Sequence, residues 1–181
     1  MALRWVREER PAWDDDKQRV IGGAPPGALD LAPASASGLP GDWWAVTDDG
    51  GTVVGYGWLD STWGGDAEIL LAVAPEAQGS GVGSFVLEHL EAEASRRGMN
   101  YVYNTVRATH PDRDRVHDWL AGRGYRGSDS DTALRKRVEA VDGAATARTP
   151  ARPASRDASH GARPPGNEES GGYVDVDEHR Y

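Results

Sequence analysis

The sequence contains no cysteine and no long apolar run, and it has a single phenylalanine among its 181 residues. Without cysteine there is no disulfide framework, no thiolate zinc site and no cysteine nucleophile, and a reducing compartment is expected. No stretch approaches the roughly 18–20 apolar residues that a membrane-spanning helix needs, and the charged residues 1–10 are unlike a signal peptide. These absences predict a cytoplasmic protein that does not associate with a membrane.

Positive charge is also scarce. The chain has 20 Lys and Arg against 29 Asp and Glu, which gives a formal net charge of -9. Nucleic-acid binding needs clustered basic residues, and the compact basic run here covers only residues 135–137. A nucleic-acid partner is therefore not expected. An acidic surface is compatible with a cationic amine as the substrate, but negative surface charge can equally serve solubility alone.

The composition changes near residue 139. All seven tryptophans and Phe85 lie before residue 120, whereas Ala, Arg, Pro, Ser and Gly dominate residues 139–181. Such a segment buries too little apolar area to offset its chain entropy. We expect one folded domain at residues 1–138 and a disordered tail at residues 139–181. Residues 173–181 alternate Tyr and Val with acids, so they form either an interaction segment, for the chain's own cleft or a partner, or a polar end with a chance pattern.

Hydropathy patterns before residue 139 predict an α/β fold, with a mixed, mostly antiparallel central sheet and flanking helices. A hairpin is expected at residues 48–51 because Asp-Asp-Gly-Gly separates two strand-like runs. The expected strands cover residues 4–7, 43–47, 52–59, 67–73, 101–106, Tyr125 and 133–138, the last two around a polar turn at residues 128–131.

Three helices are expected between these strands. A short one covers residues 14–21, with acids in its first turn. A strongly periodic one follows the glycines near residue 80 and ends before Gly98, a typical C′ residue. The third opens at Thr109, which is followed by an early proline and an acid, and ends near Gly122 or Gly124.

A glycine-rich segment at residues 79–83 joins the apolar strand 67–73 to the long helix. Its glycines allow close backbone approach, and the first amides of a helix lack intrahelical partners and attract anions. A phosphate or pyrophosphate ligand fits this pattern, and so does a purely structural tight turn. No Gly-Lys-Ser/Thr follows, which excludes a Walker loop, and the preceding hairpins disfavour a dinucleotide fingerprint.

Residues 67–84 resemble the acetyl-CoA motif of the GNAT superfamily of N-acetyltransferases, Arg/Gln-x-x-Gly-x-Gly/Ala, which stands here as Gln78-Gly-Ser-Gly-Val-Gly83. Residues 71–76, 85–90 and 118–125 look like the same family. The resemblance implies a GNAT-like acyltransferase fold with acetyl-CoA as co-substrate and no metal. It also implies transfer of the acetyl group to a primary amine of a small molecule or a protein.

The resemblance further implies which residues contact acetyl-CoA. The loop amides would hold the pyrophosphate, the preceding strand would pair with the pantetheine arm, and residues 101–106 would diverge to admit it. An N–H group near Val73 would polarise the thioester carbonyl, and the amine would attack directly. The implied cofactor-binding residues are Leu71, Ala72, Val73, Gln78, Gly79, Ser80, Gly81, Val82, Gly83 and Ser84.

Glu68 is the candidate general base. The enzyme must take a proton from an ammonium group with a pKa of about 10, and Glu68 is an ionisable residue in an apolar strand. It could also stand at the solvated strand edge. Bases of the family on this strand tend to lie six residues before the position of Val73, whereas Glu68 lies five before it. Without a bulge, its side chain points to the other sheet face.

His117 is the candidate general acid. The tyrosine that usually serves in this family falls at Leu120, and His117 lies one turn earlier on nearly the same helix face. An ordinary surface histidine, with water as the acid, is the alternative. These departures leave a second function open, a catalytically weak acyl-CoA-binding regulatory or interaction module. The sequence leaves the acceptor amine unidentified and a homodimer open.

Overall fold

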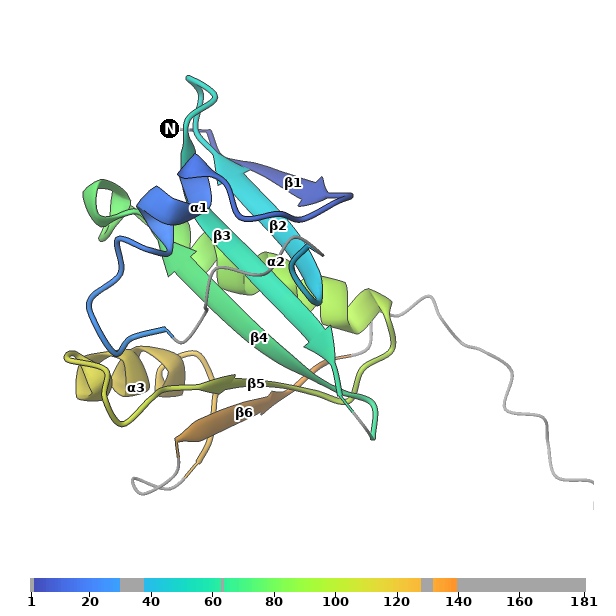
Figure 1. Cartoon of the computed structure of the whole chain (residues 1–181). Helices are drawn as coiled ribbons and strands as arrows, with labels where there is room; N and C mark the ends of the chain where they lie inside the picture. The colour runs from blue at the N-terminus through green and yellow to red at the C-terminus, as the bar shows by residue number, and fades with distance from the viewer. Residues whose placement is uncertain (1, 30–37, 63, 128–131, 140–181) are drawn as a thin grey trace, which may run out of the picture. The chain divides into compact units, whose positions relative to one another are not determined.

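The computed structural model describes residues 2–29, 38–62, 64–127 and 132–139. Within them the strands form one sheet in the order β1-β2-β3-β4-β5-β6 (Figure 1). The strands are β1 (Arg4–Glu8), β2 (Asp42–Thr47), β3 (Val53–Ser61), β4 (Asp66–Val73), β5 (Tyr101–Thr105) and β6 (Ala133–Arg137). Neighbouring strands pair antiparallel, except that β4 and β5 are parallel. The predicted mixed, mostly antiparallel sheet is confirmed.

Helices cover both faces of this sheet. They are α1 (Asp15–Val20), α2 (Val82–Arg96) and α3 (Arg113–Ala121), and a short 3-10 turn, η1 (Pro75–Ala77), follows β4. Figure 1 shows α2 behind the sheet and α1 in front of it. The apolar face of α2 is buried as its periodicity predicts, because Val86, Leu87, Leu90 and Ala94 are each at most 2% exposed.

Two glycines of β3 let α2 lie close to the sheet. A Cβ atom at Gly55 would be 3.0 Å from Val82 Cγ1, and one at Gly57 would be 3.1 Å from Val86 Cγ1. Larger residues would push the helix outward. Because β3 and β4 are neighbours, this contact also places the beginning of α2 beside the end of β4.

Helix α1 is held by a buried ion pair. Asp14 caps the helix by accepting a 2.8 Å hydrogen bond from the Lys17 amide. The Lys17 side chain is fully buried, and its Nζ donates to both carboxylate oxygens of Glu8 at 2.7 and 2.8 Å. The ammonium also lies 4.7 Å from the centre of the Tyr56 ring. This pairing ties α1 to β1 and to the sheet.

The predicted beginning of the third helix is wrong. Asp112 occupies the N-cap position of α3 without a side-chain capping bond, and Thr109 donates its hydroxyl to the carbonyl of Gly27 at 2.8 Å. Because the Thr109 hydroxyl bonds this distant carbonyl, it does not cap the helix. The bond instead joins the loop after α1 to the loop after β5.

The predicted strand at Tyr125 is also wrong. Its amide donates to the carbonyl of Leu120, in the hydrogen-bond pattern that ends a helix before a left-handed glycine, here Gly124. Only an isolated bridge between Arg126 and Arg135 remains of the expected strand. The predicted turn at residues 128–131 and residues 140–181 of the predicted tail, with segment 173–181, lie outside the described residues.

Candidate active site

The parallel strands β4 and β5 separate halfway along their length. They pair only from Asp66 with Tyr101 to Glu68 with Tyr103. Beyond this point the side chain of Asn104 donates a 2.8 Å hydrogen bond to the carbonyl of Ile69. The side-chain amide replaces a ladder bond, so the strands diverge without leaving that carbonyl unsatisfied. The divergence predicted for residues 101–106 is therefore present.

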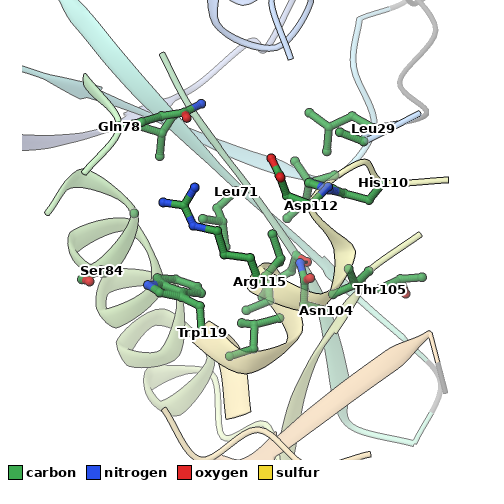
Figure 2. Close-up of a pocket in the computed structure, with 18 of the residues that line it drawn as sticks. Leu29, Leu71, Gln78, Ser84, Asn104, Thr105, His110, Asp112, Arg115 and Trp119 are labelled. Carbon is green, nitrogen blue, oxygen red and sulfur yellow. Dashed lines mark hydrogen bonds between the residues drawn. The ribbon is translucent and has the colours of Figure 1, made fainter. Parts of the chain in front are cut away.

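A cavity of about 570 Å³ opens where these strands part. It is bordered by β4, β5, the beginning of α2, the inner side of α3 and the loop after α1 (Figure 2). Its apolar and glycine lining consists of Pro25, Ala28, Leu29, Ile69, Leu70, Leu71, Val73, Gly79, Gly81, Gly83, Val106, Val116, Trp119 and Leu120. Its polar lining consists of Glu68, Gln78, Ser84, Asn104, Thr105, His110, Asp112, Arg115 and Arg123.

The loop between η1 and α2 offers a row of free backbone amides at one end of the cavity. Gly79 and Gly81 have φ angles of +76° and +93°, which favour glycine, and Gly81 is the N-cap of α2. Within the described residues, no amide from 79 to 84 donates a hydrogen bond to the chain. We call residues 79–84 the amide cradle. Its free donors and the helix dipole suit an anionic ligand.

The space in front of the amide cradle is open. A Cβ atom built on Gly79 or Gly81 would meet nothing within 4 Å. The Ser80 hydroxyl turns back to donate to the carbonyl of Ala77 at 2.6 Å. Side chains of the described residues therefore do not fill the space that an anion would need.

Glu68 lines the same cavity as Val73, although the two side chains point to opposite faces of the sheet. The register between β3 and β4 is unbroken from Gly55–Val73 to Ser61–Ala67, so no bulge changes the alternation. Both residues line the cavity because it lies where β4 and β5 part.

Two hydroxyl groups of β5 accompany the Glu68 carboxylate. Thr105 donates to it at 3.3 Å, and Tyr103 lies at the long distance of 3.5 Å. Burial, followed by the charge of Glu68, raises the pKa of Tyr103. Tyr103 therefore stays protonated at neutral pH, so it can donate to Glu68 but cannot act as a base.

Helix α3 and the residues that flank it contribute three charged residues to the lining, Asp112, Arg115 and Arg123. Figure 2 shows the side chains of Arg115 and Trp119, from α3, and of Asp112, just before it, directed into the cavity. Arg123 donates to the Ser84 hydroxyl at 2.7 Å and lies 4.0 Å from the centre of the Trp119 ring. Trp119 and Arg123 lie within the family-like residues 118–125, but nothing in the sequence distinguished Asp112 and Arg115 from ordinary surface positions.

His110 also lines the cavity and was not indicated by the sequence. Its Nδ1 accepts a 3.0 Å hydrogen bond from the Asp112 amide. In the neutral ring this bond favours the tautomer with its proton on Nε2.

His117 does not line the cavity, although α3 carries it. Its Nε2 is buried and has no hydrogen-bond partner in the described residues. The geometry therefore does not support the predicted role of His117 as general acid. Leu120, at the expected tyrosine position, does line the cavity but has no proton to donate.

The predicted cofactor-binding residues divide into two groups. The side chains or backbones of Leu71, Val73, Gln78, Gly79, Gly81, Gly83 and Ser84 border the cavity. Ala72, Ser80 and Val82 do not: Ala72 and Val82 are buried in the core, and Ser80 faces Ala77. Only the backbone amides of Ser80 and Val82 remain available to a ligand.

The fold and this divided sheet agree with the arrangement that the sequence resemblance implied. The chain belongs to the acetyltransferase (GNAT) family, whose model matches residues 4–125. The resemblance noted in the sequence is thereby confirmed, and the protein is an acetyltransferase.

Solved structures share this fold at low identity. A structure described as an acetyltransferase of the GNAT family from Desulfovibrio desulfuricans is 17% identical, with a TM-score of 0.56 over 76% of this chain and 100% of that chain. A GCN5-related N-acetyltransferase from Kribbella flavida is 21% identical, with a TM-score of 0.51 over 75% and 98%. N-acetylglutamate synthase from Neisseria gonorrhoeae, complexed with coenzyme A and L-arginine, is 20% identical, with a TM-score of 0.55 over 75% and 33%. No curated protein matches the chain.

Two absences in the described residues concern membranes and metals. No helix there is long and apolar enough to cross a membrane. No group of three or more His, Asp or Glu side chains in that part of the chain could hold a metal ion.

Proposed function

We propose that this protein transfers the acetyl group of acetyl-CoA to a primary amine by direct attack of the amine on the thioester. One observation carries the proposal: the amide cradle stands free at the end of a cavity that runs between two diverging parallel strands. A diphosphate fits the cradle, and the gap fits the extended arm attached to it.

The arm would lie along β4. Beyond Glu68 this strand has no β5 neighbour in the described residues, so its backbone groups on that side can pair with the amides of pantetheine. Leu71 and Val73 give the arm an apolar wall. An N–H group near Val73 would polarise the thioester carbonyl as the amine attacks.

Glu68 is the proposed general base. It would take a proton from the ammonium group of the acceptor, directly or through one water molecule. The free amine then attacks the thioester carbonyl and forms the C–N bond, the nitrogen gives its second proton to water, the C–S bond breaks, and coenzyme A leaves as a thiolate. Thr105 and Tyr103 would hold the carboxylate in place. Because Leu120 replaces the expected acid, water would protonate the thiolate.

A second candidate function follows from the missing acid. No tyrosine is among the described residues that line the cavity, and His117 is not among them either. A catalytically weak acyl-CoA-binding module, with a regulatory or interaction role, would show these features. Both functions require coenzyme A binding, but only the first requires release of its thiol.

A thiol-release assay separates the two functions. The full chain is incubated with acetyl-CoA and, separately, with polyamines, aminoglycosides, amino acids and peptides with free N-termini. Release of free thiol that depends on one class of amine is expected. Coenzyme A binding without release for any amine would favour the binding module.

We also propose the domain division that the composition indicates, with the catalytic domain at residues 1–138 and a separate tail at residues 139–181. A cytoplasmic location, an amine as the partner, and tail residues 173–181 as an interaction segment belong to this proposal. It is supported by the composition and by the cavity, whose lining residues all lie before residue 124.

A further inference from the structure

The amide cradle contains no formal positive charge. Residues 77–84 include no charged side chain, and Gln78, which lines the cavity, is neutral. Backbone amides and a helix dipole contribute only partial charges to an anion site. A coenzyme A diphosphate bears about two negative charges at neutral pH, so a charged partner would strengthen its binding.

Helix α3 and the residues that flank it present charged side chains to the cavity. Arg123 is already engaged, because it donates to the Ser84 hydroxyl and to the carbonyl of Trp119 at 3.0 Å. Asp112 adds a negative charge to the lining, which would repel an anion. Arg115 is the remaining charged residue that α3 directs into the cavity.

The guanidinium of Arg115 extends across the cavity towards Gln78 and the beginning of α2 (Figure 2). Its side chain is exposed, and in the described part of the chain it has no ion pair or hydrogen bond. A guanidinium can donate two parallel hydrogen bonds to phosphate oxygens. Arg115 therefore combines free donors with a position that faces the cradle.

We propose that Arg115 binds the diphosphate of the acyl-CoA substrate and supplies the positive charge that the cradle lacks. This inference rests on the proposed function, because it requires that acyl-CoA occupies the cavity. It gives α3 a direct role in binding acyl-CoA. The loop would supply neutral hydrogen-bond donors, and the helix would supply a charged donor.

Calorimetric titration of the full chain tests the proposal with Arg115→Gln, Arg115→Lys and the wild type. The titrants are coenzyme A and 3′-dephospho-coenzyme A, and pantetheine binding is followed separately by ligand-observed NMR. Arg115→Gln should weaken binding of both nucleotides about tenfold or more and by the same factor, because one charge-assisted interaction is lost. Pantetheine binding should not change, and Arg115→Lys should retain part of the affinity.

Two further variants sharpen the test. Arg4→Gln removes one positive charge from β1, at the far edge of the sheet, and should bind coenzyme A as the wild type does. Adding Gln78→Arg to Arg115→Gln places a guanidinium on the loop side of the cavity and should restore most of the affinity. Rescue in this double variant would indicate that charge at the cradle, rather than packing, determines binding.

Three outcomes would overturn the inference. Wild-type affinity in Arg115→Gln would show that the guanidinium does not contact the ligand. A loss seen with coenzyme A but absent with 3′-dephospho-coenzyme A would assign the residue to the 3′-phosphate. An equal loss for pantetheine would indicate general damage to the site. By contrast, failure of the wild type to bind coenzyme A would contradict the proposed function itself.

Discussion

Whether a residue belongs to this site depends on its position beside the gap between β4 and β5 more than on the sheet face to which its side chain points. Glu68 and Val73 point to opposite faces, and a sequence argument from alternation alone would separate them. They line one cavity because the sheet opens between them and the next strand. This geometry supports the proposal that Glu68 acts as a base on an amine beside a thioester held at the strand edge.

Replacing Glu68 by Gln should lower kcat by about 100-fold while leaving the affinity for coenzyme A unchanged, because only proton removal from the amine is lost. Steady-state kinetics and calorimetry give the two quantities. Asp60→Asn is the matched control, since Asp60 pairs with Glu68 across the strands but does not line the cavity. Equal kcat values for Glu68→Gln and the wild type would exclude Glu68 as the base.

Replacing Gly81 by Ala should weaken coenzyme A binding about tenfold. The φ angle of +93° would strain alanine by about 1 kcal/mol, and its Cβ would enter the open space before the cradle. Gly98→Ala imposes similar strain at the other end of α2, where φ is +70° and space is also open. Both variants should lose similar unfolding free energy, but only Gly81→Ala should lose affinity. Equal affinities would show that the cradle does not contact the ligand.

Sequence reasoning identified part of the site and missed the rest for a physical reason. Glu68 and the glycines stand out because a charge in an apolar strand and a glycine run before a helix have few local explanations. Arg115 and His110 lie in a polar stretch where surface positions look the same. Only their place beside the cavity in the folded chain distinguishes them.

At the scale of elements, the strands and helices could be predicted from periodicity, but their tertiary connections could not. Each expected strand longer than one residue is present, and α2 buries the face that its repeat indicates. The error at Thr109 arose because a capping pattern looks the same whether its hydroxyl caps a helix or bonds a distant carbonyl. Where β4 and β5 part, the Asn104 side chain satisfies the Ile69 carbonyl, and no short sequence pattern marks this contact.

The buried pair of Lys17 and Glu8 should be the strongest polar link between α1 and β1. Glu8→Ala should lower the free energy of unfolding by about 3 kcal/mol, because it leaves a fully buried ammonium without its main partner. Arg7→Ala removes a surface pair with Asp42 and should cost less than about 1 kcal/mol. Urea denaturation of both variants measures the difference. Equal losses of unfolding free energy would show that the buried pair of Lys17 and Glu8 stabilises the fold no more than the surface pair does.

At the scale of the whole molecule, the described core and the cavity are complete before residue 140. The core residues end at Leu134, and the last described contact is a 2.7 Å hydrogen bond from the Ser95 hydroxyl to the carbonyl of Glu139. The family match, at residues 4–125, also ends before the tail.

Deleting residues 140–181 should therefore leave the unfolding free energy and the affinity for coenzyme A unchanged. Thermal unfolding and calorimetry of the truncated chain measure both, and retention of Glu139 preserves the bond to Ser95. A marked fall in either quantity would contradict the proposed division into a catalytic domain and a tail. A changed KM for the amine would indicate instead that the tail reaches the acceptor end of the cavity.

The most direct test of the central claim is an NMR titration of the ¹⁵N-labelled full chain with coenzyme A. The claim predicts that the amide signals of residues 79–84 shift most, because these free donors acquire phosphate acceptors, while those of β1 stay in place. Saturable shifts confined to other parts of the chain, with the amides of residues 79–84 unmoved, would contradict it.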